Sequence, residues 1–149
     1  MLPYLLALFL FKSLIFQFNL PSIFSKIVSG EIPCYKIAEN IHFIAFLDVF
    51  PLKKGHVLVV PKKEVDYIFD LDNETYQGLM SFSKQVSLAI KQAIPCNRVG
   101  LSVIGLEVPH AHIHLIPINT MNDMNFSNEK LKLTKDEFEE IAEQIRKYI

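Results

Sequence analysis

The chain has 149 residues, 50% of them hydrophobic, and a formal net charge of −1 at pH 7. This length suits one domain with a hydrophobic core and is short for two. The balance of 15 basic and 16 acidic residues gives no overall electrostatic reason to expect nucleic acid or membrane binding, so phosphate recognition has to be local. Cys34 and Cys96 follow no metal or redox spacing. We expect reduced thiols in a cytoplasmic protein, although the sequence leaves a disulfide open.

Residues 1–22 form an almost wholly apolar extension without an acidic residue. A secretory signal would carry basic residues before the apolar run and a small-residue cleavage site, and neither is present. A membrane anchor would need about 20 uninterrupted apolar residues, but Lys12 stands at the centre. We rank an over-extended gene start first, a membrane anchor second and a cleaved signal third. Membrane contact is expected only if the anchor is real.

The region after this extension has the pattern of an α+β domain, which we place at residues 23–126. A short helical turn with one apolar side is expected at residues 23–27, and Gly30 is a suitable end for it. Short apolar runs separated by turn residues then predict an antiparallel meander. Its strands are expected at residues 35–39, 42–48 and 56–61.

Downstream of the meander, the pattern changes to a long helix and then returns to strands. Asp72 is a suitable helix N-cap, apolar residues follow with helical spacing, and Pro95 ends the pattern. Two further apolar runs predict strands at residues 98–104 and 111–118.

The chain ends in a polar loop and a second amphipathic helix. Thr134 and Glu137 have the spacing of a capping box, which marks the start of this helix. We treat residues 127–149 as a C-terminal helical extension. The predicted fold class is α+β: about five antiparallel strands in one sheet, one long helix after the central strands, and an added C-terminal helix.

The strongest functional signal is a run of three histidines, His110, His112 and His114, that alternate with apolar residues. On a strand the side-chain period is two, so the three imidazoles are expected on one face, while Ala111 and Ile113 enter the core. Core packing explains such a run poorly, because each ring has polar nitrogens to satisfy. The run therefore predicts a chemical site.

From the residues alone, two chemistries stay open for this run. The first is metal binding, because His-x-His on a strand presents two imidazoles to zinc, with Asp48, Glu107 or His56 available as further ligands. The second is nucleophilic catalysis. A free imidazole has a pKa of about 6.5, so at neutral pH it is largely unprotonated and can attack phosphorus. Neighbouring imidazoles or main-chain N–H groups would stabilise the phosphate oxygens.

Several stretches resemble the histidine triad (HIT) superfamily, and in particular its Hint-like, bacterial-type members. His-Ala-His-Ile-His-Leu-Ile, which starts at residue 110, is similar to the family signature of histidines alternating with hydrophobic residues. Residues 23–33, 45–48 and 55–62 resemble the family's opening segment and two central strands, in the same order. The resemblance covers residues 23–118. It implies a HIT-like fold, a homodimer, and a mechanism that needs neither a cofactor nor a metal.

The resemblance also implies roles for single residues. His112 would attack the α-phosphorus of a nucleotide and become a transient nucleotidyl-histidine, which water then hydrolyses. His114 would contact the phosphate, and His110 and His56 would complete the polar network that orients His112. Asp48 would accept hydrogen bonds from ribose hydroxyls, although by itself it is nearly as typical of a turn at a strand end.

A set of apolar side chains would form the pocket for the base, although core packing explains the same residues equally well. These residues are Ile23, Phe24, Ile27, Phe46, Val49 and Leu58.

The segment before the triad departs from the family pattern. Residues 101–108 contain neither the asparagine nor the glutamine that Hint-like members usually place there, and Glu107 stands where a neutral serine often assists the leaving group. We count Glu107 among the nucleotide-binding residues. Ser22 and Ser25 occupy the places of cysteines that bind structural zinc in some bacterial members, which disfavours zinc.

The expected activity is that of a nucleotide-binding hydrolase or transferase at a nucleotide α-phosphate, for example hydrolysis of a purine nucleoside phosphoramidate. One alternative is a dinucleoside polyphosphate hydrolase of the fragile-histidine-triad type. Another is a nucleotide-binding or interaction protein with little catalysis, and a third is a metallohydrolase. The expected partner is a purine nucleotide or nucleotide adduct, not a nucleic acid.

Overall fold

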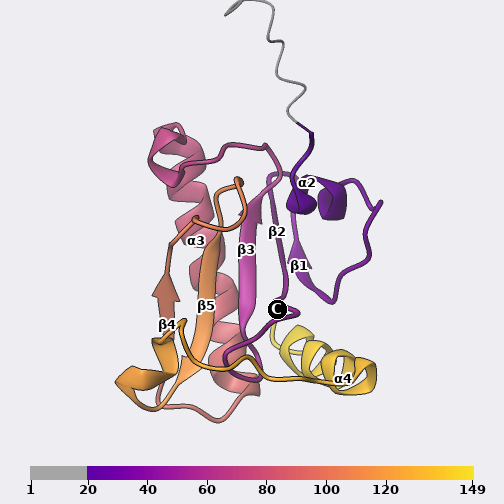
Figure 1. The fold of residues 1–149 in the computed structure, drawn as a ribbon, viewed down its shortest axis with the longest axis vertical. Coiled ribbons are helices and arrows are strands. Elements are labelled where there is room, and N and C mark those ends of the chain that lie inside the picture. Colours follow the sequence, from indigo (N-terminus) through magenta and orange to yellow (C-terminus); the bar gives the residue numbers. More distant parts are fainter. Residues whose placement is uncertain (1–19) are drawn as a thin grey trace, which may run out of the picture.

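The computed structural model describes residues 20–149, which fold around one five-stranded antiparallel sheet in the order β1-β2-β3-β5-β4 (Figure 1). The first three strands form the predicted meander, and β5 then pairs with both β3 and β4. The predictions for residues 1–19 lie outside the described residues. The strands are β1 (Lys36–Glu39), β2 (Phe43–Leu47), β3 (Val57–Pro61), β4 (Arg98–Ser102) and β5 (Ile113–Ile118).

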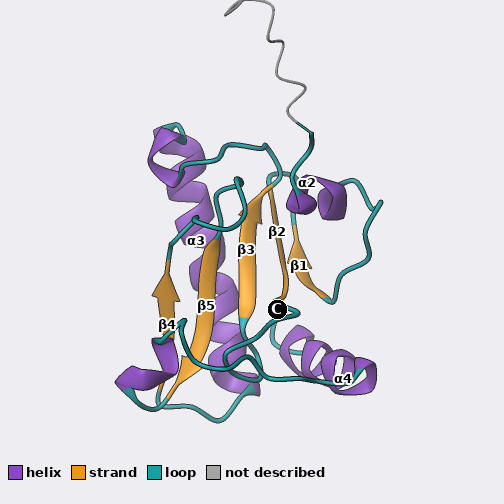
Figure 2. Ribbon diagram, in the orientation of Figure 1, coloured by secondary structure: helices purple, strands orange, loops and turns teal. Residues whose placement is uncertain are grey.

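Two long helices and one short one accompany the sheet, and their ends follow the sequence signals (Figure 2). The Asp72 side chain accepts a hydrogen bond of 2.8 Å from the Thr75 N–H, and Thr134 and Glu137 cap each other reciprocally, so both predicted helix starts are confirmed. The α-helices are α2 (Ile23–Val28), α3 (Asn73–Ala93) and α4 (Lys135–Arg146), and the 3-10 helices are η1 (Ile68–Asp70) and η2 (Met121–Met124).

One face of the sheet forms the main hydrophobic core, against α3 and α4. Alternate residues of the central strands enter this core, among them Val57 and Val59 of β3 and Ile113 and Leu115 of β5. Ala111 enters it as well, so the predicted alternation around the histidines is confirmed. Within residues 20–149, no helix has both the length and the apolar character that a bilayer-spanning helix requires.

The other face carries the candidate site. Phe46, Leu58 and His114 are direct neighbours across β2, β3 and β5, so their side chains share this face. Phe24 of α2 packs onto the same face in a smaller apolar cluster with Phe46 and Leu58. The α2 helix therefore forms one wall beside the histidine strand.

The strands next to the histidines are shorter than predicted. β5 begins at Ile113 rather than at residue 111, because the Ala111 N–H donates to the carbonyl of Val65 and the His110 N–H to that of Val108. β4 ends at Ser102 rather than at residue 104. His110 and His112 thus lie in the loop that enters β5, and only His114 lies within the strand. Cys34 and Cys96 are both free thiols.

Candidate active site

A pocket of about 400 Å³ opens on the face of the sheet that carries the histidines. Its walls come from α2, the end of β2, the segment of residues 104–108 and a loop between η2 and α4. Every residue predicted for the site lines this pocket, with the exception of His110. The predicted residues on its wall are Ile23, Phe24, Ile27, Phe46, Asp48, Val49, His56, Leu58, Glu107, His112 and His114.

His110 lies behind the pocket wall, with 0% of its surface exposed. Its Nε2 lies 2.8 Å from the Pro61 carbonyl oxygen, and because a carbonyl can only accept, Nε2 carries the proton. Its Nδ1 lies 2.7 Å from Ser22 Oγ and therefore accepts the hydroxyl proton. Burial lowers the pKa of His110, so the ring is neutral at pH 7. Both ring nitrogens are thus occupied by the protein itself.

Ser22 belongs to a polar clasp that joins α2 to the loop after β3. We define this clasp as Ser22, Ser25, Glu64 and His110. The Ser22 N–H donates to Glu64 Oε2 at 3.0 Å, Ser25 Oγ donates to the same oxygen, and the Ser25 N–H donates to Ser22 Oγ at 3.0 Å. The hydrogen bond from Ser25 is the main reason that the pKa of Glu64 is lowered. The clasp therefore fixes the start of the helix that carries Phe24.

His112 is held by a main-chain atom. Its Nδ1 lies 2.7 Å from the carbonyl oxygen of His110, so Nδ1 carries the proton and Nε2 keeps a free lone pair. Its ring packs edge-on against Phe24, with 5.0 Å between the ring centroids. Within residues 20–149, no group hydrogen-bonds to Nε2, and the side chain lines the pocket. In the neutral ring, this arrangement leaves the Nε2 lone pair free for a ligand in the pocket.

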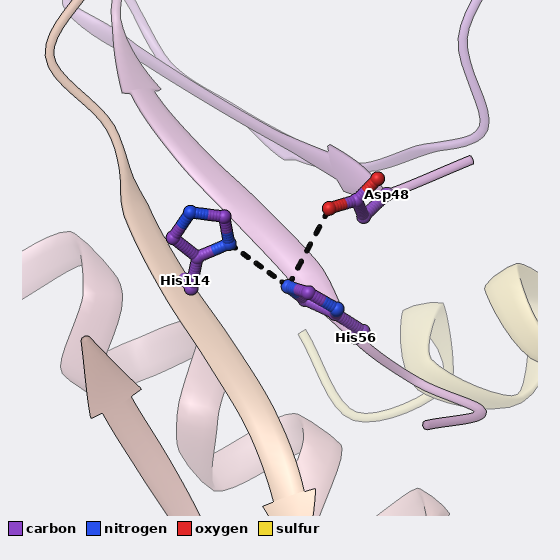
Figure 3. A group of neighbouring side chains, drawn as sticks. All are labelled: Asp48, His56 and His114. Atoms are coloured by element: carbon purple, nitrogen blue, oxygen red, sulfur yellow. Dashed lines mark hydrogen bonds and ion pairs between the residues drawn. The ribbon is translucent and has the colours of Figure 1, made fainter. Parts of the chain in front are cut away.

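His56 and His114 form the other half of the histidine network (Figure 3). The Leu52 N–H donates to His56 Nδ1 at 3.1 Å, so the proton of His56 is on Nε2. That nitrogen donates to His114 Nδ1 at 3.0 Å, which leaves His114 with a proton on Nε2. His114 also lines the pocket, so this N–H is a candidate donor to a ligand.

Both rings of this pair are neutral at pH 7. Burial is the main cause that lowers the pKa of His56 to about 3, and it lowers the pKa of His114 to about 3 as well. Asp48 Oδ2 lies 3.6 Å from His56 Nε2 (Figure 3). Because His56 is neutral, this contact is a weak dipolar interaction and not an ion pair.

Asp48, His56 and His114 are also the side chains that could hold a metal ion, within the part of the chain that the structure describes. Their candidate ligand atoms all lie within 4.8 Å of one another. A metal on His56 Nε2 would require the proton to move to Nδ1, where it would face the Leu52 N–H donor. The hydrogen bonds of the site therefore disfavour metal binding by His56, while they fit a metal-free arrangement.

The pocket wall also contains residues that were not predicted from the sequence, and Phe126 and Lys130 are two of them. Both come from the loop between η2 and α4. The Phe126 ring packs edge-on against His114 and His56, at centroid distances of 4.9 and 6.4 Å. This loop has no hydrophobic periodicity that could have indicated its contact with the site. Ser22 and Glu64 were not predicted as part of the site either. The Ser22-x-x-Ser25 spacing, at positions where some bacterial family members carry cysteines, was a signal that could have indicated Ser22.

Comparison with known proteins finds similar sequences and structures in one family. The family model of the HIT domain matches residues 29–121. An uncharacterised HIT-like protein of Borreliella burgdorferi is 33% identical over 131 residues, which cover 83% of this chain and 94% of that protein. An adenosine 5′-monophosphoramidase of Schizosaccharomyces pombe is 40% identical over 99 residues, 64% of this chain and 72% of that enzyme.

Among solved structures, a HIT-like protein of Bartonella henselae superimposes with a TM-score of 0.75 at 28% sequence identity, and covers 86% of this chain and 96% of its own. The Bartonella henselae protein is involved in cell-cycle regulation, and its crystal structure contains an unknown ligand. The match to residues 29–121 and the identity to the Borreliella burgdorferi protein show that this chain belongs to the HIT domain family.

Proposed function

We propose that the protein is a nucleotide hydrolase that cleaves a bond at the α-phosphate of a purine nucleotide, through a covalent nucleotidyl-histidine on His112. The observation that carries this proposal is that His112 and His114 each have one ring nitrogen without a partner in the described residues, and both side chains line the pocket. His112 Nε2 has a free lone pair, and His114 Nε2 carries a proton. A nucleophile and a hydrogen-bond donor therefore stand side by side, with 4.9 Å between the ring centroids.

The proposed reaction has two displacements at phosphorus. In the first, His112 Nε2 forms a bond to the α-phosphorus and the bond to the leaving group breaks, with the leaving group taking a proton from water. In the second, water attacks phosphorus and loses a proton to the solvent, which replaces the proton that the leaving group took. The bond to Nε2 breaks, its electron pair returns to the ring nitrogen, and the nucleoside monophosphate departs. The positive charge that the ring gains in the intermediate is stabilised by the hydrogen bond from Nδ1 to the His110 carbonyl oxygen.

The remaining pocket residues fit a nucleotide. The His114 Nε2–H would donate to a non-bridging phosphate oxygen, where negative charge develops in the transition state. Asp48, which lies at the end of β2, would accept hydrogen bonds from the ribose hydroxyls. Phe24 and Phe46 supply aromatic surface beside which a purine base can pack.

The relative named as an adenosine 5′-monophosphoramidase supports a phosphoramidate as the substrate. We therefore propose adenosine 5′-phosphoramidate as the first compound to test. Diadenosine polyphosphates test the main alternative: a faster turnover of those compounds would identify a dinucleoside polyphosphate hydrolase instead.

The assembly and location of the protein are part of the same proposal. β4 is an edge strand. Leu101 on this strand and Val103 and Ile104 after it are exposed apolar residues. Pairing of two copies through this edge would cover them, so we propose a homodimer. We also propose a cytoplasmic protein whose HIT domain spans residues 23–126, followed by the helical extension.

The decisive experiment is to trap the intermediate. The protein is mixed with adenosine 5′-phosphoramidate, quenched in denaturant and digested, and the peptides are analysed by mass spectrometry. We expect AMP on His112. In parallel, His112→Asn should bind AMP but show no turnover, while His42→Asn, a change at an exposed histidine, should behave like the wild type. AMP attached to another residue, or full activity of His112→Asn, would overturn the mechanism.

A further inference from the structure

The charges around the pocket are unusual for a site that binds a phosphate. The imidazoles of His56 and His114 are neutral at pH 7 because burial lowers the pKa of each to about 3. Among the described residues that line the pocket, the carboxylates are Asp48 and Glu107, and the only lysine or arginine is Lys130. A phosphate that enters the pocket would therefore find Lys130 as the only lysine or arginine among the described lining residues.

Lys130 is held firmly at this place. Its ammonium group donates to the carbonyl oxygens of Phe126 and of Asn128, the latter at 3.0 Å. An ammonium group has three N–H donors, so one stays free for a ligand. Phe126, whose carbonyl oxygen accepts one of these hydrogen bonds, packs with its ring against His114 on the pocket wall. After burial, the charge of Lys130 is the next cause of the low pKa of His56, as expected for a cation close to that ring.

The loop that carries Lys130 is itself anchored to the domain. The Leu131 N–H donates to the Pro51 carbonyl oxygen at 2.8 Å, and Lys53 Nζ lies 3.1 Å from Asp123 Oδ1 at the other end of the segment. Both contacts join it to the loop between β2 and β3, next to Asp48 and His56. Lys130 lies outside residues 29–121, which match the family. The cation of the pocket thus comes from the C-terminal part of this chain and not from the matched domain.

We propose that Lys130 is a specificity-determining residue that makes the pocket select nucleotides over nucleosides, by supplying the positive charge that the phosphate requires. The proposal rests on the proposed nucleotide site and adds a residue to it. A half-buried ammonium that is fixed by two hydrogen bonds attracts a phosphate dianion more strongly than a fully exposed lysine would. A nucleoside carries no charge, so its binding is expected to be insensitive to Lys130.

The test measures the affinity of AMP and of adenosine by calorimetry for the wild type and three variants of the full chain. Lys130→Gln removes the charge, and Lys130→Arg keeps it. Lys132→Gln removes the same charge two residues away, at an exposed position that does not line the pocket. We expect Lys130→Gln to lower the affinity for AMP about tenfold, which is the scale of one charge-assisted hydrogen bond. The affinity for adenosine should fall by less than about twofold. Lys130→Arg should recover most of the AMP affinity, and Lys132→Gln should change neither ligand.

A second measurement does not depend on the folding of any variant. In the wild type, raising the salt concentration should lower the affinity for AMP and leave the affinity for adenosine unchanged. Salt screens the attraction between Lys130 and a charged ligand, and adenosine carries no charge. Equal losses of AMP and adenosine in Lys130→Gln, or an unchanged AMP affinity, would overturn the role of Lys130. If the wild type neither binds AMP nor forms the adduct on His112, the proposed function has failed instead.

Discussion

His110 and His114 are each two residues from His112, and both rings are buried, but their surroundings differ. The two nitrogens of His110 bond to Ser22 Oγ and to the Pro61 carbonyl oxygen, and the ring does not line the pocket. His114 receives one hydrogen bond, from His56, and its second nitrogen carries a proton at the pocket.

This difference separates two kinds of histidine that look identical in the sequence pattern. A ring whose nitrogens are both occupied by its own protein stabilises the fold and positions its neighbours. A ring with one nitrogen left at a pocket can act on a ligand. We therefore expect changes on the His114 side to alter the chemistry, and changes on the His110 side to alter stability and positioning.

Among the variants that compare these two histidines, the largest effect is expected from His114→Asn. The shorter asparagine side chain places no N–H where His114 Nε2 lies, and loss of this donor should lower kcat for adenosine 5′-phosphoramidate by about a hundredfold, the usual scale for one lost transition-state donor. Steady-state kinetics give this value, and thermal unfolding checks that the variant is folded. His42→Asn, at an exposed position, is the matched control. A kcat that stays within about threefold of the wild type would remove the distinction between the two histidines.

The next effect is a loss of stability in acid. The pKa of His56 and of His114 is about 3 in the folded protein, below the ordinary value of 6.5, so between these values the unfolded chain binds more protons. Their contribution to the free energy of unfolding is therefore complete above pH 6.5 and is lost as the pH falls towards 3, by up to about 1.4 kcal/mol per imidazole and pH unit. Urea unfolding at pH 7 and at pH 5 measures this.

A comparison of variants assigns that loss to the buried rings. His114→Asn should flatten the dependence of stability on pH, while His42→Asn should leave it as in the wild type because His42 is exposed. The same slope in all three proteins would mean that the buried pair does not control stability in acid.

Ser22→Ala examines the His110 side. The change removes the cap of α2 and leaves His110 Nδ1 without its donor, so the free energy of unfolding should fall by about 1 to 2 kcal/mol. Because α2 carries Phe24, the KM of the phosphoramidate should rise more than kcat falls. Chemical unfolding and steady-state kinetics report the two quantities, with Ser81→Ala on the exposed side of α3 as the control. A loss of kcat alone would contradict a positioning role.

The smallest effect is expected from Glu107→Gln. This exposed carboxylate lines the pocket and repels a bound phosphate. Its neutralisation should therefore raise the affinity for AMP by about two- to threefold. Adenosine should bind as before, and calorimetry with both ligands provides the answer. Weaker binding of AMP to this variant would mean that Glu107 makes a favourable contact with the nucleotide.

The sequence indicated most of the fold because its signals were local. Two kinds of signal depend on residues only a few positions apart, and both are confirmed. They are the apolar alternation around Ala111 and Ile113 and the helix caps at Asp72 and Thr134. The strand limits were wrong where the backbone found another partner. The Ala111 N–H bonds to the Val65 carbonyl oxygen, which no pattern in residues 111–118 could reveal.

The candidate site was predictable only in part, because some of its residues are placed by contacts between distant parts of the chain. Eleven of the twelve predicted residues line the pocket. The contributions of Ser22 and Lys130 depend on contacts across long stretches of chain, because Ser22 meets His110 and the loop of Lys130 meets Pro51. The partners of His110 and His112 include carbonyl oxygens, which every residue type offers and which therefore leave no trace in the sequence.

The main-chain acceptor that holds His112 also bears on how this site can evolve. The hydrogen bond to its Nδ1 ends on the carbonyl oxygen of residue 110, an atom that any amino acid would provide. Substitutions at position 110 can therefore alter the clasp with Ser22 while the acceptor for His112 is retained, as long as the loop keeps its path. The tautomer of His112 is therefore set by the course of the backbone and not by the side chain at position 110.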